Sequence, residues 1–134
     1  MNTQIYPKKK TFSKFDEKHF IVYLNEEQAD YVPSLSGMEQ REGENVEPVP
    51  GYSYSGPLVD GGTMIEAKEA CYAEFVSGLL RLSYSADAES AILANMTVAL
   101  SEPKNERAAE FKTEWKAFQA KREECKQLAH RLLG

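Results

Sequence analysis

Cysteine and histidine are the residue types best suited to catalysis or metal binding, and the chain has two of each. Cys71 and Cys125 are far apart in sequence, and each has apolar neighbours at helical spacing. A zinc site needs four ligands at short spacings, which His19 and His130 do not complete. A thiol–imidazole pair is disfavoured because Cys125 and His130, five residues apart, face different sides of a helix. We predict two reduced, buried thiols and no metal or cofactor, with a disulfide as the alternative in an oxidising compartment.

Acidic residues are plentiful, but none has the setting that catalysis requires. Glu123 and Glu124, and also Glu106, Glu110 and Glu114, fall on the polar side of a predicted helix. Carboxylates that act as acids or bases need desolvation or crowding in a cleft. The sequence also lacks G-x-S-x-G, H-E-x-x-H and the dinucleotide-binding fingerprint. We therefore predict that the protein is not an enzyme.

Two tyrosines and a threonine form the most plausible ligand-binding group. Tyr52 and Tyr54 alternate with serines, which places both rings on one face of an extended segment. After a turn at residues 60–62, Thr63 and Glu66 stand at capping-box spacing and predict the start of a helix. A helix start attracts anions, but the lysine of a phosphate-binding loop is absent. We expect structural roles for these residues, with a ligand face of Tyr52, Tyr54 and Thr63 as the alternative.

Length and composition restrict the class of protein. The chain has 134 residues, of which 42% are hydrophobic and 28% charged, as in one ordinary globular unit. Its net charge of −5 excludes a uniformly basic nucleic-acid-binding face. No apolar run reaches membrane-spanning length, and residues 1–10 do not resemble a secretory signal. We expect a cytoplasmic protein without nucleic-acid or membrane partners.

Charge is unevenly distributed over the first fifty residues. Five lysines lie within residues 1–20, whereas residues 25–50 contain seven acidic residues and a single arginine. The prolines and glycines between Pro33 and Gly51 predict a long loop. We expect these charges to be solvent-exposed loop residues without a partner role. The alternative is a basic arm, within residues 1–18, that binds an acidic protein.

Hydrophobic patterning predicts strands first and helices afterwards. The apolar run Phe20–Leu24 indicates a strand, and Ile5–Tyr6 before a proline indicates an edge strand. Three helices are then expected: one from Thr63 to Leu82, one after Ser85 or Asp87 that closes before Pro103, and one from Asn105 to Leu133. The inner face of the second would be Ile92, Leu93, Met96, Ala99 and Leu100. We predict an α+β fold in which residues 1–62 form a small antiparallel β part and residues 63–134 form three helices, the last one long.

The last helix has the clearest pattern in the chain. A seam with alternating steps of three and four residues comprises Ala108, Phe111, Trp115, Phe118, Arg122, Cys125, Ala129 and Leu132. A helix over Asn105–Leu133 would be about 43 Å long, more than two shorter helices readily cover. We therefore predict that Phe111, Trp115, Phe118 and Arg122 present a surface to a protein partner or another copy, with a core role for the aromatic residues as the alternative.

Three segments resemble a known family. They are GYSYSGPLVDGGTMIEA (residues 51–67), YSADAESAILANMTVAL (84–100) and AKREECKQLAHRLL (120–133). Together they are similar to the uncharacterised C-terminal domain of tail-fibre assembly proteins, which phage and prophage tail genes encode. Tyr84, Asp87, Ser90 and Ile92 match its central segment, and Trp115 and Phe118 match its final helix. The lysine-rich start and the acidic loop depart from that pattern, and no catalytic residue transfers.

The resemblance and the seam together predict a non-enzymatic structural or assembly protein of a phage or prophage tail. It would act through contacts with a tail protein or with copies of itself. The competing hypothesis is a small ligand-binding or catalytic domain with its site near Tyr52, Tyr54 and Thr63.

Overall fold

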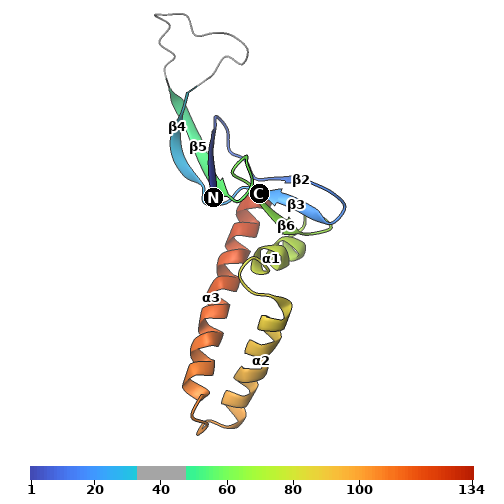
Figure 1. Cartoon of the computed structure of the whole chain (residues 1–134), viewed down its shortest axis with the longest axis vertical. Coiled ribbons are helices and arrows are strands. Elements are labelled where there is room, and N and C mark those ends of the chain that lie inside the picture. Colours follow the sequence, from blue (N-terminus) through green and yellow to red (C-terminus); the bar gives the residue numbers. More distant parts are fainter. Residues whose placement is uncertain (33–47) are drawn as a thin grey trace, which may run out of the picture. The chain divides into compact units, whose positions relative to one another are not determined.

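A computed structural model of the chain describes residues 1–32 and 48–134. Within these residues the strands come first and the helices follow (Figure 1). The elements are β1 (Asn2–Tyr6), β2 (Phe12–Lys14), β3 (His19–Val22), β4 (Glu27–Tyr31), β5 (Val49–Gly56), β6 (Thr63–Glu66), α1 (Tyr72–Leu80), α2 (Ala86–Ser101) and α3 (Ala108–Leu133). The predicted α+β fold, with a long last helix, is confirmed.

The strands form two small sheets, with the orders β1-β5-β4 and β2-β3-β6. In the first sheet both neighbours of β5 are antiparallel to it, and Tyr52 pairs with Tyr6 on one side and Gln28 on the other. Strand β1 is an edge, as predicted for Ile5–Tyr6. Pro50 lies in the central strand, but only β4 pairs with it, because the pairing with β1 begins at Tyr52. A residue without an N–H is tolerated at such a position.

The chain divides into two compact units. The first comprises Met1–Lys14 and Ile21–Met64, and the second comprises Phe15–Phe20 and Ile65–Gly134. The first unit holds the tyrosine-rich sheet, and the second unit holds the helices. Phe20 and Phe75 meet edge to face in the core of the second unit, with ring centroids 5.3 Å apart.

The prediction of a helix starting at Thr63 is wrong, because residues 63–66 form strand β6. Thr63 and Ile65 are buried, whereas Met64 and Glu66 between and after them are more exposed. This period of two, with two β-branched residues, is the pattern of a strand and overrides the capping-box spacing. Helix α1 begins only at Tyr72. Cys71 is therefore its N-cap residue rather than part of its inner face.

Two other boundaries differ from the predictions. Of the predicted loop between Pro33 and Gly51, residues 33–47 lie outside the described part of the chain. Val49–Gly51 are not loop but the start of β5, held by pairing with β4. The predicted strand Phe20–Leu24 is confirmed in part, as β3 at His19–Val22.

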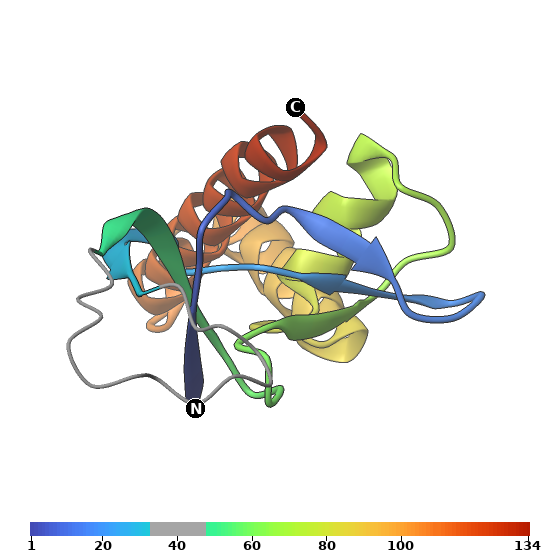
Figure 2. The same ribbon diagram turned by 90° about the horizontal axis from the view of Figure 1, so that it is seen from above.

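The two shorter helices cover the long one in succession. Ala99, near the end of α2, packs with Ala108 and Phe111 at the start of α3. Tyr84, in the connection before α2, meets Phe118 at 5.2 Å between ring centroids. Tyr72, at the start of α1, stacks on His130 near the end of α3 at 4.6 Å. In Figure 1 α2 runs beside the first part of α3 and α1 lies across it nearer the C-terminal end, and in Figure 2 both helices lie on one side of α3.

Candidate protein-interaction surface

The seam of α3 faces the interior of its own unit. Six of its eight positions are buried: Ala108, Phe111, Phe118, Cys125, Ala129 and Leu132. Helix α3 has 26 residues and is about 39 Å long. Helix α2 packs on the first part of α3, where Ala99 contacts Ala108 and Phe111, and α1 packs on its last turns, where Tyr72 stacks on His130. The prediction that two shorter helices leave much of this seam uncovered is therefore wrong.

The predicted partner surface on α3 is accordingly divided. Phe111 and Phe118 are 6% and 2% exposed, so they anchor the core and offer nothing to another chain. Trp115 is half-buried, and Arg122 is exposed. Arg122 lies one turn beyond Phe118, which Tyr84 contacts from the connection between α1 and α2. The charged side chain of Arg122 therefore extends into solvent.

The exposed apolar residues of the helical unit are instead on α2. Only Ala99 of its 16 residues is buried. Leu93 is 45% exposed and Leu100 is 66% exposed. With other exposed residues at steps of four and three they form one line along the helix, which we call the α2 strip: Ala86, Ser90, Leu93, Thr97 and Leu100. From Ser90 to Ser101 the helix contains no charged residue.

The hydroxyl groups of Thr97 and Ser101 on this face donate hydrogen bonds within the helix. The Thr97 hydroxyl donates to the carbonyl oxygen of Leu93 at 3.0 Å. The Ser101 hydroxyl donates to the carbonyl oxygen of Thr97 at 2.9 Å. Burial under another chain would therefore leave neither hydroxyl proton without an acceptor. The part of the strip from Leu93 to Leu100 therefore behaves as an apolar surface despite Thr97.

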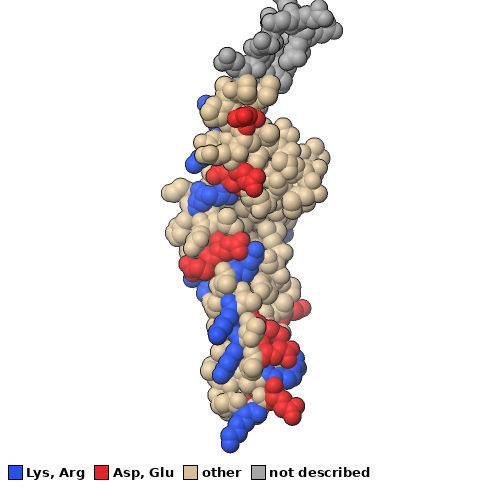
Figure 3. Space-filling view, turned by 90° about the vertical axis from the view of Figure 1, so that its left-hand side faces the viewer, with Lys and Arg blue, Asp and Glu red and all other residues tan. Residues whose placement is uncertain are grey.

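The exposed face of α3 is different. It carries ion pairs between neighbouring turns, such as Arg107 with Glu110 at 3.1 Å and Lys121 with Glu124 at 3.5 Å. Figure 3 shows the side of the molecule on which α3 lies, where positive and negative side chains alternate along the helical unit. Such a face is well solvated, whereas α2 carries no charged residue from Ser90 to Ser101.

The alternative ligand face is not assembled as predicted. Tyr54 is fully buried, and its hydroxyl donates to Glu26 Oε1 at 2.6 Å and accepts from the Lys10 backbone N–H at 2.9 Å. Thr63 is buried in a strand rather than placed at a helix start. Both residues serve the core, so they cannot line a ligand site together with Tyr52.

Tyr54 belongs to a cluster of aromatic rings that closes one face of the first sheet. Its ring meets that of Tyr23 at 5.8 Å, and Tyr23 meets Tyr6 at 6.0 Å. Lys10 Nζ lies 4.1 Å from the Tyr6 ring centroid and 4.9 Å from that of Tyr23. The Tyr23 hydroxyl donates to Asp60 Oδ2 at 2.8 Å. Burial, together with this hydrogen bond to a carboxylate, raises the pKa of Tyr23 to about 12.

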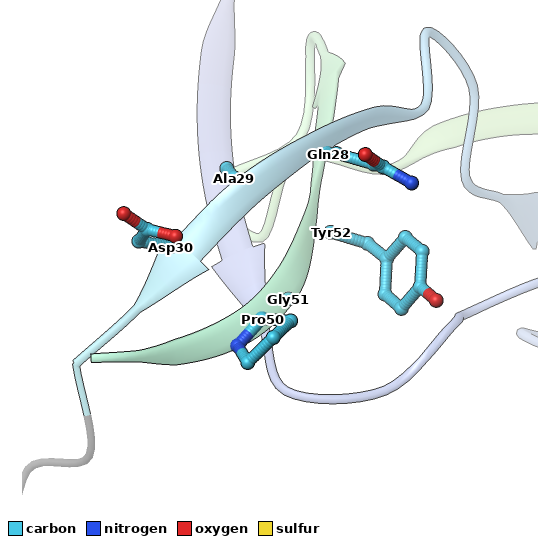
Figure 4. A pocket seen from close by; sticks show the side chains of 6 residues that line it. All are labelled: Gln28, Ala29, Asp30, Pro50, Gly51 and Tyr52. Carbon is cyan, nitrogen blue, oxygen red and sulfur yellow. The ribbon is translucent and has the colours of Figure 1, made fainter. Parts of the chain in front are cut away.

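Tyr52 borders a pocket (Figure 4). The pocket has a volume of about 320 Å³ and lies on β4 and β5; its lining is Gln28, Ala29, Asp30, Pro50, Gly51 and Tyr52. In Figure 4 the Tyr52 ring and the Gln28 amide extend to the same side, and Asp30 extends away from them. Lys9 Nζ lies 5.5 Å from the centroid of the Tyr52 ring. The polar groups therefore do not converge on a common point.

Both cysteines are free thiols, as the reduced interpretation predicts. Cys125 is buried, and this burial raises the pKa of its thiol, whereas Cys71 is half-buried. Residues 1–32 and 48–134 contain no group of three His, Cys, Asp or Glu side chains placed to hold a metal ion. Among the same residues, no helix combines the length and apolar character that crossing a membrane requires.

Sequence reasoning assigned Leu93 and Leu100 to the inner face of α2, and the structure places them outside. Ala99 is buried and Ile92 and Met96 are half-buried, so the inner face lies on their side. The sequence pattern does not reveal the outer face, because the twelve residues from Ser90 to Ser101 are uncharged and apolar residues occur on every side of the helix. The available signal was this absence of charge, because a surface helix ordinarily has a charged side.

Comparison of the chain with known protein families, with curated proteins and with solved structures finds no match in any of the three.

Proposed function

We propose that this chain is a non-enzymatic structural or assembly protein that acts through protein–protein contacts, and that it serves a phage or prophage tail. The observation that supports a contact function is the α2 strip, an uncharged line with two exposed leucines on a helix whose other side packs on α3. Exposed leucines grouped on one helix face are typical of surfaces that another chain covers.

The tail assignment rests on the sequence resemblance of residues 51–67, 84–100 and 120–133 to tail-fibre assembly proteins. The matching residues Ser90 and Ile92 lie on α2 itself, and Trp115 and Phe118 lie on the helix that supports it. The protein would act in the host cytoplasm or in the virion, where its partner is a tail protein or a further copy.

The test is binding of a purified tail-fibre protein from the same genome to the immobilised chain. The double variant Leu93→Glu/Leu100→Glu places two charges on the strip and should weaken binding at least about tenfold. Leu82→Glu is the matched control, because Leu82 is 49% exposed but lies outside α2. A chain that binds no tail-fibre protein and does not self-associate would overturn the proposal.

A second candidate function is binding of a small molecule at the Tyr52 pocket, which the pocket itself favours. Aromatic rings in open pockets stack on sugars, so N-acetylglucosamine and maltose are suitable probes in a ligand-detected NMR experiment. A saturation signal that disappears in Tyr52→Ala and persists in Tyr52→Phe would favour this function. The absence of a signal with both sugars would count against a sugar ligand.

A further inference from the structure

We propose that the α2 strip pairs with the same strip of a second copy, in an antiparallel arrangement about a two-fold axis near Thr97. This inference rests on the proposed contact function and names a second copy of the chain as the partner.

The absence of charge on this part of α2 favours a partner surface that is also uncharged. No charged residue lies between Ser90 and Ser101, so a charge on a partner's face would be desolvated there without a counter-charge. The exposed faces of α3 carry ion pairs and do not meet this condition. Among the surfaces described, the α2 strip of a second copy does meet it.

The spacing of the leucines makes the strip self-complementary. Leu93 and Leu100 are seven residues apart, two helical turns, and the smaller Thr97 lies between them. In an antiparallel pair Leu93 of one copy lies beside Leu100 of the other, and the reverse contact follows from the two-fold symmetry. Exposed Ala94 and Ser101 flank the line, and their small side chains allow the two helices to approach closely.

Charges at the helix ends select the antiparallel orientation. The first turn of α2 carries Asp87 and Glu89, and its last turn carries no basic residue. Lys104 follows the end of the helix and is exposed. Glu102 lies at the same end, and Glu89 already pairs with Arg81 at 2.7 Å. Antiparallel pairing therefore brings the exposed Asp87 of one copy toward an end of mixed charge on the other, whereas parallel pairing brings the two Asp87 carboxylates together. The helix dipoles favour the same orientation.

The hydroxyl groups near the centre of the contact can be buried without losing a hydrogen bond. Thr97 and Ser101 already donate to carbonyl oxygens of their own helix, so the dimer buries no unsatisfied hydroxyl proton of these two residues. One helix pair is smaller than a standard interface of about 1,600 Å², so we expect a dimer that dissociates on dilution.

The first experiment is light scattering on the full chain from about 1 µM to about 1 mM. The apparent mass should rise from 15.1 kDa toward twice that value as the concentration increases. Leu93→Glu/Leu100→Glu should keep the monomer mass throughout, and Leu82→Glu should behave as the native chain. Circular dichroism of each variant verifies that the helices are intact.

The second experiment determines the orientation by disulfide cross-linking. In a Cys71→Ser background, Thr97→Cys should form disulfide-linked dimers under mild oxidation, because the two Thr97 positions face each other across the axis. Ser90→Cys lies on the same strip, but antiparallel pairing separates its two copies by about 20 Å, so it should not cross-link. Cys125 remains in place because it is buried.

A chain that stays monomeric up to about 1 mM, or a Ser90→Cys variant that cross-links as fast as Thr97→Cys, would overturn the antiparallel dimer. The proposed function would survive a monomeric result if Leu93→Glu/Leu100→Glu still weakened binding of the tail-fibre protein. The strip would then belong to that protein instead of a second copy. Loss of both activities would remove both proposals.

Discussion

Gly78 of α1 lies directly against Glu66 of β6: a Cβ atom at position 78 would be 2.7 Å from the Glu66 carbonyl oxygen. The same atom would also be 3.1 Å from Cδ1 of Ile65. The sequence alone assigns this glycine a cost of about 1 kcal/mol within a helix. The structure explains the glycine, because α1 can approach β6 this closely only if residue 78 has no side chain.

Gly78→Ala should therefore destabilise the protein, although the same change ordinarily stabilises a helix. We expect a loss of about 1–3 kcal/mol in the free energy of unfolding, since backbone rather than a flexible side chain blocks the new methyl group. Ser77→Ala, at an exposed position of the same helix, is the control and should be neutral or slightly stabilising. Urea denaturation followed by circular dichroism measures both, and a more stable Gly78→Ala variant would contradict the close packing.

Tyr54→Phe should destabilise the first unit by about 1–3 kcal/mol. The change removes the hydroxyl that accepts from the Lys10 N–H and donates to Glu26, and it leaves that backbone donor without this acceptor. Tyr52→Phe, two residues earlier in the same strand, should change the stability by less than about 0.5 kcal/mol because its ring borders an open pocket. Equal effects of the two variants in urea denaturation would show that the Tyr54 hydroxyl contributes nothing.

Stability should decrease at alkaline pH in a manner that depends on Tyr23. Its pKa is about 12 in the folded chain, above the ordinary value of 10.0, so folding favours the protonated phenol. This contribution is fully present below pH 10 and is lost as the pH rises through 12. Tyr23→Phe should weaken the decline in unfolding free energy between these values. Urea titrations from pH 8 to 12 test this, and identical slopes for the two proteins would argue against it.

The two thiols should differ in reactivity. Cys125 is 1% exposed and burial raises its pKa, so its reactive thiolate is scarce and inaccessible, whereas Cys71 is half-buried at the start of α1. At pH 8, Ellman's reagent should label about one thiol per native chain and the second only in denaturant. Cys71→Ser should abolish the native labelling; rapid labelling of that variant would mean that Cys125 is accessible.

Sequence patterns predicted the elements with strong periodicity and failed where two patterns competed. The three–four spacing on α3 located both the helix and its buried side, from Ala108 to Leu132. At Thr63 the capping-box spacing competed with an alternation of buried and exposed residues, and the alternation prevailed because β6 pairs within a sheet. A local spacing rule contains no information about pairing with a distant strand.

The candidate sites were predicted less well, for a related reason. A seam on one helix shows which side is apolar, but not which element covers it, and α1 and α2 cover that of α3. On α2 the residues are apolar on all sides, so the pattern could not separate Ala99 inside from Leu100 outside. That distinction depends on the direction from which α3 approaches.

The lysine-rich beginning of the chain is built into the first sheet. Strand β1 pairs with β5 from Asn2 to Tyr6, and Lys10 lies over two of the tyrosine rings. A truncation that removes the first ten residues would thus take away an edge strand and uncover aromatic rings, which invites aggregation. Shortened versions intended to test an N-terminal tether would report damage to the sheet, whereas charge-reversing substitutions at exposed Lys8 would leave its strands in place.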